Sequence, residues 1–573
     1  MNTEIITKAR QWLSDAFDGD TRARVKEMMD HHPEELTECF YKNLEFGTGG
    51  LRGLMGVGTN RMNIYTVGMA TQGLCNYLKR NFAEPAAIKV AVAHDSRNNS
   101  RLFAETAAGV FAANGIGVYL FESLRPTPEL SYAIRRFGCR SGVVVTASHN
   151  PKEYNGYKAY WEDGAQVIPP HDKAIIEEVG KTSIEAVRFN GPKELITVIG
   201  KETDEAYTDM IVNLTLSPEA IRRCHDLKIV YTPIHGTGVA LVPMALEKKG
   251  FTRICHIPEQ DVADGNFPTV KSPNPEESAA LNLAIRKAKE TDADIVMGTD
   301  PDADRVGIAV KNGQGEWVIL NGNQAAAVLI YYLVRRWGEL GKLTGKEYIV
   351  KTIVTTELLA EIAAGSHLPC YDVLTGFKWI ADVLRRNEGK SVFIGGGEES
   401  YGYLCSDAVR DKDAVMSCAY FAEIAAWAKD QGKTLFDLLL EIYAQYGFYK
   451  ETGISTVKTG KSGAEEITAM MNNYRSHPPK NIDGSPVVKI TDYARQTATD
   501  LKTGTVSPVD LPKSDVLQFF TEDGSKISIR PSGTEPKIKY YVSVKETLPS
   551  IADYGKINLL LDRKIERIGK EFQ

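Results

Sequence analysis

The chain has 573 residues, of which 43% are hydrophobic and 25% are charged, and its formal net charge is -6. This composition is ordinary for a folded globular protein, and the length predicts three or four domains. A general binder of nucleic-acid backbones would need a basic surplus, so the acidic balance argues against that class. A local basic pocket for a small anion remains compatible with the composition.

The compartment is predicted from the cysteines and the chain start. The eight cysteines have neither C-x-x-C pairs nor zinc-finger spacing, so we interpret them as buried thiols in a reducing compartment. The start MNTEIITKARQWL lacks a basic segment followed by an apolar run, so no signal peptide is expected. The longest apolar stretch, near Ala325 to Val334, is too short to span a bilayer. We therefore expect a cytoplasmic protein without nucleic-acid or membrane partners; its oligomeric state is left open.

Short β-branched runs alternate with polar loops and helical patterns along most of the chain, which predicts α/β units. Strands are expected at 88–93, 142–145, 229–231, 294–297 and 392–394, and helices at 102–114 and 276–289. The end of the chain differs: two strands, 526–530 and 537–544, surround a Gly/Pro loop and precede a helix at 557–572. We place boundaries near residues 205, 322 and 452, which predicts domains 1–205, 206–322, 323–452 and 453–573.

The first polar loop of interest, Thr146–Pro151, follows the apolar strand that ends at Val145. A small serine on a tight strand-end loop can act as a nucleophile, which makes Ser148 the candidate, with Lys158 ten residues further on. The alternative is a turn with a capping serine. No G-x-S-x-G motif is present, so acyl transfer is disfavoured.

The second loop, Asp300–Arg305, carries carboxylates at alternate positions: Asp300, Asp302 and Asp304. Three such groups turned inward form a hard oxygen site that suits Mg²⁺ or Ca²⁺, and they leave room for a phosphate oxygen. An EF-hand is excluded because its glycine and glutamate positions hold Arg305 and Lys311. A solvated acidic turn is the remaining alternative.

The third loop, Gly395–Gly402, combines glycines that allow close backbone approach with Glu398 and Ser400, which suit sugar hydroxyls. Nearby Thr375–Trp379 adds a cation and two aromatic rings, although such rings are more often core residues. A flexible turn is the alternative for the glycine loop.

The fourth loop, Arg530–Lys537, offers an arginine, two hydroxyls and glycine-freed backbone N–H groups, which together form an anion-binding nest. A β-hairpin turn is the alternative. The segment Phe46–Gly53 matches G-x-G-x-x-G only loosely and follows no clear strand, so a Rossmann fingerprint is rejected. Because ligands gather outside the carboxyl ends of strands in α/β sheets, the four strand-end loops could converge on one cleft.

Taken together and in this order, the loops resemble those of the α-D-phosphohexomutase superfamily over essentially the whole chain. T-A-S-H-N-P with Y-N-G-x-K resembles its phosphoserine loop, and D-P-D-A-D-R resembles its metal loop. G-E-E-S-Y-G resembles its sugar-binding loop, and R-P-S-G-T-E-P its phosphate-binding loop. F-G-T-G-G-L-R-G and M-G-V-G-T-N-R-M-N further resemble the long branch of phosphoglucomutases and phosphopentomutase-like enzymes.

The resemblance implies three related α/β domains and a smaller C-terminal α+β domain around a central cleft. It implies that Ser148 carries the phosphoryl group and joins the three aspartates as a ligand of Mg²⁺. Lys158 and Arg305 would act at the reacting phosphoryl group, with Arg52 and His149 in support. The expected substrate contacts are Thr375, Gly376, Lys378, Glu398, Ser400, Arg530, Ser532, Gly533 and Thr534.

The implied activity is that of a phosphoglucomutase, which exchanges glucose 1-phosphate and glucose 6-phosphate through a phosphoserine and glucose 1,6-bisphosphate. We expect Lys158 to take the proton of the entering hydroxyl. Dual phosphomannomutase/phosphoglucomutases often have histidine where this chain has Phe377, which weakens mannose as the main substrate without excluding it. A phosphomannomutase, a phosphopentomutase, a sugar-phosphate phosphatase and a non-catalytic sugar-phosphate binder remain the alternatives, and the sequence does not specify the source of the bisphosphate.

Overall fold

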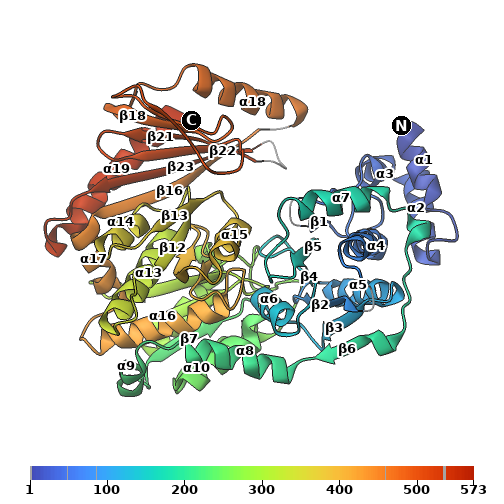
Figure 1. Cartoon of the computed structure of the whole chain (residues 1–573), viewed down its shortest axis with the longest axis horizontal. Helices are drawn as coiled ribbons and strands as arrows, with labels where there is room; N and C mark the ends of the chain where they lie inside the picture. Colours follow the sequence, from blue (N-terminus) through green and yellow to red (C-terminus); the bar gives the residue numbers. More distant parts are fainter. Residues whose placement is uncertain (1–2, 48–49, 85–86, 459, 533–536, 573) are drawn as a thin grey trace. The chain divides into compact units, whose positions relative to one another are not determined.

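The computed structural model describes residues 3–47, 50–84, 87–458, 460–532 and 537–572 (Figure 1). The chain divides into two compact units. Unit 1 comprises Met1–Leu320, Ala381–Gly389 and Ser400–Gly432, and unit 2 comprises Asn321–Ile380, Lys390–Glu399 and Lys433–Gln573.

Unit 1 opens with a small helical layer made of α1 (Thr3–Gln11), α2 (Gly19–His31) and α3 (Pro33–Phe40). Helix α2 begins where the Asp18 carboxylate accepts a hydrogen bond from the backbone N–H of Thr21, 2.7 Å away, which caps the helix. The rings of Trp12, Phe17 and Tyr65 pack together and form the core of this layer.

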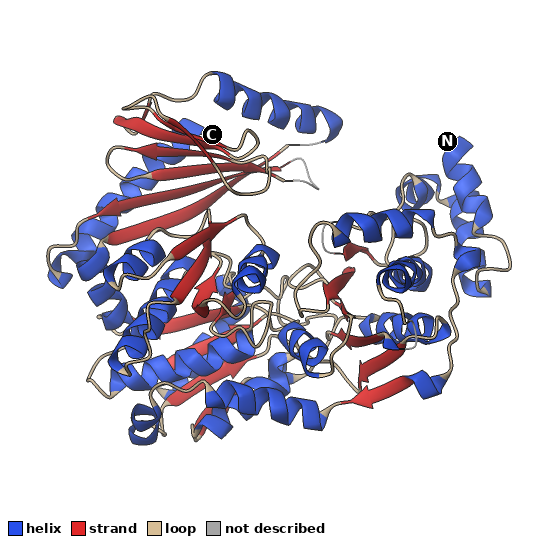
Figure 2. Ribbon diagram, viewed as in Figure 1, coloured by secondary structure: helices blue, strands red, loops and turns tan. Residues whose placement is uncertain are grey.

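The first sheet of unit 1 has the strand order β1-β5-β4-β2-β3-β6. Its strands are β1 (Gly50–Leu54), β2 (Lys89–His94), β3 (Gly117–Phe121), β4 (Ser141–Val145), β5 (Tyr154–Trp161) and β6 (Ile196–Ile199). The covering helices are α4 (Ile64–Asn81), α5 (Ser100–Ala113), α6 (Thr127–Arg136) and α7 (His171–Lys181) (Figure 2). The middle of strand β2 is apolar because Val90 and Val92 pack into one core while Ala91 and Ala93 pack into the other.

The second sheet of unit 1 has the order β11-β10-β9-β7-β8. Its strands are β7 (Lys228–Thr232), β8 (Arg253–His256), β9 (Ile295–Thr299), β10 (Val306–Lys311) and β11 (Trp317–Leu320), and the short strand β15 (Tyr403–Leu404) also belongs to this unit. The helices are α8 (Lys201–Asn213), α9 (Pro218–Arg223), α10 (Gly238–Lys249), α11 (Pro258–Asp261), α12 (Ser278–Thr291) and α16 (Ala414–Lys429). Strands β9 and β10 are antiparallel, so Asp300–Arg305 forms the tip of their hairpin.

Unit 2 starts with a parallel layer in which β12 (Glu347–Thr352) lies between β13 (Cys370–Val373) and β14 (Val392–Gly397). Helices α13 (Gly322–Glu339), α14 (Leu358–Gly365) and α17 (Leu435–Tyr446) accompany it, and α15 (Phe377–Asn387) crosses the boundary between the units. Helices α13 and α17 each begin with a reciprocal capping box, formed by Asn321 with Gln324 and by Thr434 with Asp437.

The end of unit 2 is an antiparallel sheet with the order β16-β23-β22-β21-β18-β19-β20, with β17 paired to β18. The strands are β16 (Phe448–Val457), β17 (Asn481–Ile482), β18 (Ser485–Asp492), β19 (Thr497–Asp500), β20 (Val506–Pro508), β21 (Leu517–Thr521), β22 (Lys526–Pro531) and β23 (Lys537–Glu546). Helices α18 (Gly460–Ser476) and α19 (Tyr554–Phe572) pack on it. This layer is the β-rich C-terminal part that the sequence predicts.

The predicted fold class, α/β units followed by a C-terminal α+β part, is confirmed, while the predicted domain boundaries stay predictions. One local expectation was wrong: helix α12 begins at Ser278, so Glu276 precedes it and forms an ion pair with Arg305 instead of occupying the first turn. Residues 50–53, at the end of the segment for which a Rossmann fingerprint was rejected, belong to strand β1 and pair with β5.

Two further expectations concern the thiols and the membrane. Six of the eight cysteines are buried, as expected, whereas Cys255 and Cys370 are partly exposed. Within the described part of the chain, none of the helices combines the length and the apolar character needed to cross a membrane.

Candidate active site

Ser148 lies in the loop that follows strand β4, in a left-handed backbone conformation with φ of 52°. Its backbone N–H donates to the Thr146 hydroxyl over 2.8 Å, which closes a tight turn. The Ser148 hydroxyl donates to Oδ2 of Asp300 over 2.9 Å and lies 3.2 Å from Nδ1 of His149. The loop therefore presents this hydroxyl to the acidic hairpin of the second sheet.

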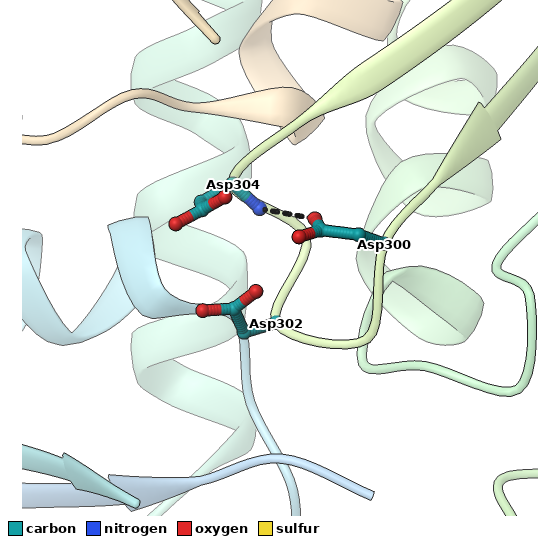
Figure 3. A group of neighbouring side chains, drawn as sticks. All are labelled: Asp300, Asp302 and Asp304. Atoms are coloured by element: carbon teal, nitrogen blue, oxygen red, sulfur yellow. Dashed lines mark hydrogen bonds between the residues drawn. The ribbon is translucent and has the colours of Figure 1, made fainter. Parts of the chain in front are cut away.

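The three predicted metal ligands come together at that hairpin tip, as Figure 3 shows. Asp300, Asp302 and Asp304 are buried, and their ligand oxygens lie within 4.8 Å of one another. Oδ1 of Asp300 accepts hydrogen bonds from the backbone N–H groups of Asp304 (3.1 Å) and Arg305 (3.0 Å), which folds the loop back on itself. Ala303 completes the turn with φ of 48°.

The pKa values of Asp300 and Asp302 are shifted in opposite directions. Burial, followed by the charges of Asp302 and Asp304, raises the pKa of Asp300 well above its usual value. Burial alone would also raise the pKa of Asp302, but the Lys158 ammonium 2.8 Å away holds that pKa below its ordinary value. The hairpin is a concentrated negative site that requires cations nearby.

The residues present fit a magnesium ion. Among the described residues, Oδ1 of Asp302 and Oδ1 of Asp304 are buried without a hydrogen-bond partner. Buried carboxylate oxygens normally have partners, and hard oxygen donors of this kind are what Mg²⁺ prefers. These carboxylates could therefore hold a divalent cation, and their role as metal ligands stays a prediction.

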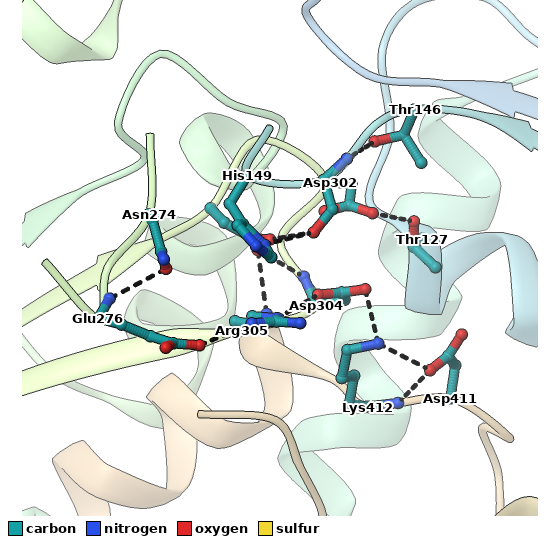
Figure 4. A network of polar contacts seen from close by, with 12 residues as sticks. Thr127, Thr146, His149, Asn274, Glu276, Asp302, Asp304, Arg305, Asp411 and Lys412 are labelled. Atoms are coloured by element: carbon teal, nitrogen blue, oxygen red, sulfur yellow. Dashed lines mark hydrogen bonds and ion pairs between the residues drawn. The ribbon is translucent and has the colours of Figure 1, made fainter. Parts of the chain in front are cut away.

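Cationic side chains lie beside the cluster, and Figure 4 shows two of them, Arg305 and Lys412. Nζ of Lys158, on strand β5, lies 2.8 Å from Asp302 and 3.5 Å from Asp304. Nη1 of Arg305 lies 2.6 Å from Glu276, and its Nε is 3.9 Å from Asp304. Two of the predicted catalytic cations are therefore brought to the acidic hairpin.

Lys412 is a third cation at this hairpin, and sequence reasoning missed it. Its Nζ lies 2.8 Å from Asp304 and 3.4 Å from Asp411, whose carboxylate also accepts the Tyr160 hydroxyl at 2.7 Å. In the sequence, Asp411–Asp413 precedes an apolar helix and indicates only a helix start. No local signal identifies the lysine between these aspartates as a partner of a residue more than 100 positions earlier.

His149 and Arg52, the two expected supporting residues, also lie in unit 1. Burial, then the charges of Arg305 and Arg52, lowers the pKa of His149 to about 2, so its imidazole is neutral. Arg52 projects from β1 and donates to the side-chain oxygen of Asn150 over 3.1 Å. His149 therefore belongs to the loop of Ser148, and Arg52 borders that loop.

Two supports of the acidic hairpin were not predicted. Thr127, at the start of α6, donates its backbone N–H to the carbonyl of Asp302 (2.9 Å) and its hydroxyl to the carboxylate (3.1 Å). The loop at Gly236 packs behind the hairpin so closely that a Cβ there would lie 2.5 Å from Cα of Pro301. Both contacts join distant segments, and neither has a sequence motif.

The predicted sugar loop lies in unit 2. Oε1 of Glu398, just after β14, accepts the backbone N–H of Gly376 over 2.9 Å, which brings two predicted substrate residues together. The φ of Gly376 is 111°, a conformation that favours glycine. Nζ of Lys378 lies over the ring of Trp379, 5.4 Å from its centroid. The two other predicted residues of this segment, Thr375 and Gly376, precede it in the chain, separated from it by Phe377.

The neighbouring Glu399 attaches this loop to the end of strand β12 and the segment that follows it. Its Oε2 accepts hydrogen bonds from the hydroxyls of Thr352 and Thr355, each over 3.2 Å. The boundary between the units follows Glu399, so Ser400 belongs to unit 1, where it is half-buried. Its role as a sugar contact stays a prediction.

The predicted phosphate loop connects β22 and β23 at the end of unit 2. Arg530 pairs with Lys539 near the end of β22, and the N–H of Ser532 donates to the carbonyl of Lys537 over 2.7 Å. Gly533 and Thr534 lie outside the described residues. The hairpin is therefore present, and its role as an anion nest stays a prediction.

The fold and the geometry of unit 1 define a class: an α/β protein with a strand-end serine opposite a buried carboxylate and cation cluster, an arrangement suited to phosphoryl transfer. Three models of the phosphoglucomutase/phosphomannomutase family, for its alpha/beta/alpha domains I, II and III, match residues 43–185, 205–314 and 321–446.

Similar proteins agree with these matches. A phosphoglucomutase of Staphylococcus aureus (strain MRSA252) is 36% identical over 96% of this chain and 98% of its own length. A phosphoglucomutase/phosphomannomutase family protein from Burkholderia thailandensis has a TM-score of 0.61 at 20% identity, covering 91% of this chain and 96% of its own. The open form of parafusin from Paramecium has a TM-score of 0.65 at 18% identity, covering 92% and 96%. The chain belongs to the phosphoglucomutase/phosphomannomutase family.

Proposed function

We propose that this protein is a phosphoglucomutase that interconverts glucose 1-phosphate and glucose 6-phosphate through phosphorylated Ser148. The observation that supports this most is the 2.9 Å contact between the Ser148 hydroxyl and Asp300, within a buried cluster that has unsatisfied carboxylate oxygens. Relatives named phosphoglucomutase, 36% identical over nearly the whole chain, support the same reaction.

In the proposed reaction the phosphoryl group leaves the oxygen of Ser148 and bonds to the free hydroxyl of a sugar monophosphate, whose proton goes to a base. After the bisphosphate has turned around, its other phosphoryl group returns to the oxygen of Ser148, and the sugar oxygen that it leaves takes up a proton, which releases the isomeric monophosphate. Asp300, Asp302, Asp304 and the oxygen of Ser148 would hold Mg²⁺, which would neutralise charge on the transferring group. The cations Lys158, Arg305 and Lys412 contribute further positive charge at the cluster.

Lys158 is the proposed proton acceptor, and its contacts bear on that role. Burial alone would lower its pKa, but the charges of Asp302 and Asp304 raise that pKa above the ordinary value. The raised pKa favours the protonated ammonium form of Lys158, which supplies positive charge. This form must lose its proton before Lys158 can accept one from the sugar hydroxyl. Its acceptor role stays a prediction.

The sugar is proposed to bind through Glu398 and the residues around it, and its non-reacting phosphate through the Arg530 hairpin. The bisphosphate intermediate must be held in two orientations that exchange its C1 and C6 ends. A half turn of that kind places O3 roughly where O4 was, so one carboxylate can accept the same pair of hydroxyls in both orientations. Glu398 suits this task because its charge strengthens both hydrogen bonds.

The proposal is tested with the 1-phosphates of glucose, mannose, ribose and glucosamine as substrates, with Mg²⁺ and glucose 1,6-bisphosphate present. We expect isomerisation of glucose 1-phosphate to be fastest, with little free phosphate released. Release of one phosphate per sugar consumed would identify a phosphatase instead, and faster turnover of mannose or ribose 1-phosphate would change the assigned substrate.

A further inference from the structure

Arg97 lies under the loop of Ser148 and contacts none of the three aspartates in the described structure. It follows strand β2, the neighbour of β4 in the first sheet, and its side chain is fully buried. Nη1 donates to the carbonyls of Pro151 (2.8 Å) and Tyr154 (3.1 Å), and Nη2 donates to the carbonyls of Ser148 and Asn150. One guanidinium thus binds four carbonyl groups of a single loop.

Arg97 is itself held from two sides. Oδ2 of Asp95 lies 3.3 Å from its Nε, and that carboxylate also accepts the Ser100 hydroxyl over 2.6 Å. The ring of Phe267 lies 5.1 Å from the guanidinium carbon. In the chain, Phe267 lies between strands β8 and β9 of the second sheet, the sheet whose β9–β10 hairpin carries Asp300, Asp302 and Asp304. Arg97 therefore contacts both the loop of Ser148 and a residue from the part of unit 1 that contains this sheet.

The chemistry of this contact is specific to arginine. Buried carbonyls need donors, and a planar guanidinium supplies five N–H groups in a fixed fork, whereas a lysine offers three from one atom. The contact also turns the carbonyl dipoles of Ser148 and Asn150 toward Arg97. Their negative ends are thereby neutralised by a cation, which lowers their repulsion of an anionic phosphoryl group on the serine.

We propose that Arg97 is a positioning residue, which fixes the loop of Ser148 so that its hydroxyl stays aligned with the acidic hairpin for phosphoryl transfer. This inference rests on the proposed function. Arg97 acts through the loop backbone, so it should affect the transfer step and leave sugar-phosphate binding nearly unchanged.

The first test compares Arg97→Lys with Arg101→Lys in the full chain. Arg101 is an exposed arginine that binds Glu105 (2.8 Å) and the carbonyl of Glu122 (3.1 Å) and makes no contact with the loop. We expect Arg97→Lys to lower kcat for glucose 1-phosphate about 100-fold, as misplacement by about 1 Å can do, with KM within about threefold. Arg101→Lys should keep the kcat of the unaltered protein.

The second test separates positioning from general stability. Amide hydrogen exchange across 146–154 should speed up at least about tenfold in Arg97→Lys, because the carbonyls of this segment lose the guanidinium donors that hold it in place. Exchange in Arg101→Lys should stay unchanged.

Asp95→Asn removes the ion pair with Arg97 and keeps the side-chain acceptor for Ser100. This variant should lower kcat less than Arg97→Lys does, again at constant KM. In Arg97→Ala, methylguanidinium should restore part of kcat, and methylammonium should not.

The results of these tests either support or overturn the positioning role of Arg97. Normal kcat in Arg97→Lys, or equal restoration by both small cations, overturns the inference. The same follows if Arg97→Lys is unfolded and Asp95→Asn has normal kcat. Absence of mutase turnover in the unaltered protein refutes the proposed function itself, whereas turnover in that protein with an indifferent Arg97 refutes only this inference.

Discussion

At the scale of single residues, the site depends on backbone conformations that side chains rarely adopt. Ser148, Ala303 and Tyr401 have φ of 52°, 48° and 65°, and each belongs to a different one of the four polar loops. A left-handed residue other than glycine costs about 1–2 kcal/mol, so the surrounding contacts must maintain it. For Ser148 these are the Thr146 hydroxyl and the guanidinium of Arg97. Strain of this kind gathers where a side chain has to be presented in one direction.

Ser148→Ala should abolish mutase turnover, because no other hydroxyl is assigned to carry the phosphoryl group. Intact-mass and peptide mass spectrometry should find phosphate on Ser148 in part of the unaltered protein and none in the variant. Phosphate located on another residue, or normal turnover by the variant, would contradict this assignment.

Asp302→Asn should lower kcat by about 100- to 1000-fold with a smaller change in KM, because charge neutralisation matters most in the transition state. The control is Asp292→Asn, which alters an exposed carboxylate paired with Lys311 and should keep normal kinetics. Steady-state rates at saturating Mg²⁺, and in excess chelator, make the measurement. Full activity in chelator would refute the metal site.

At the scale of elements, the polar loops at strand ends were predictable because each follows a short strand whose residues are apolar or alternate between polar and apolar. Strands β2, β4, β7 and β9 and helices α5 and α19 lie within a few residues of their predicted ranges. Lys412, Thr127 and Arg97 were not predictable in the same way, since their partners are distant in sequence and none occupies an unusual local pattern. The start of α12 was misplaced because a glutamate suited to a first helical turn pairs with Arg305 instead.

Glu398→Gln tests the sugar loop. Losing the charge-assisted contacts should cost about 1.5–3 kcal/mol of transition-state binding, with forward and reverse rates slowed by similar factors and Ser148 still phosphorylated. Initial rates in both directions are measured, with Glu546→Gln, an exposed glutamate of unit 2, as control. A loss confined to one direction, or equal use of the C4 epimer galactose 1-phosphate, would show that Glu398 does not hold both orientations.

Lys526 connects two elements of unit 2. It is buried on β22, and its Nζ donates to the carbonyls of Ile353 (3.1 Å) and Thr355 (3.3 Å) and to Glu357. Lys526→Met should lower the free energy of unfolding by about 2–4 kcal/mol, because buried acceptors lose their donor. Urea unfolding followed by intrinsic fluorescence makes the measurement. Lys489→Met, an exposed lysine of the same sheet, should change stability by less than about 0.5 kcal/mol, and an equal effect of both would refute the role of the buried lysine.

At the scale of the whole molecule, buried carboxylates make stability depend on pH. Asp413 caps α16 by accepting the N–H of Met416 (2.8 Å) and also accepts the Tyr207 hydroxyl (2.7 Å). Burial outweighs these bonds and raises the pKa of Asp413 from 3.8 to about 7. In unit 2, burial likewise raises the pKa of Glu451 to about 7. Each unit therefore contains a carboxyl group that folding favours in its protonated form.

The stability contributed by Asp413 should be fully present below pH 4 and should be lost as the pH rises toward 7, since the unfolded chain releases this proton first. At about 1.4 kcal/mol per pKa unit, the change is on the order of 4 kcal/mol. Urea midpoints between pH 4.5 and 8 should fall with pH in the unaltered protein and fall less in Asp413→Asn, because asparagine still caps the helix and does not ionise. Asp407→Asn removes an exposed carboxylate of the same segment and should keep the original slope. If Asp413→Asn had the same slope as the unaltered protein, Asp413 would titrate alike in the folded and unfolded states, and the burial of its charge would not limit stability at neutral pH.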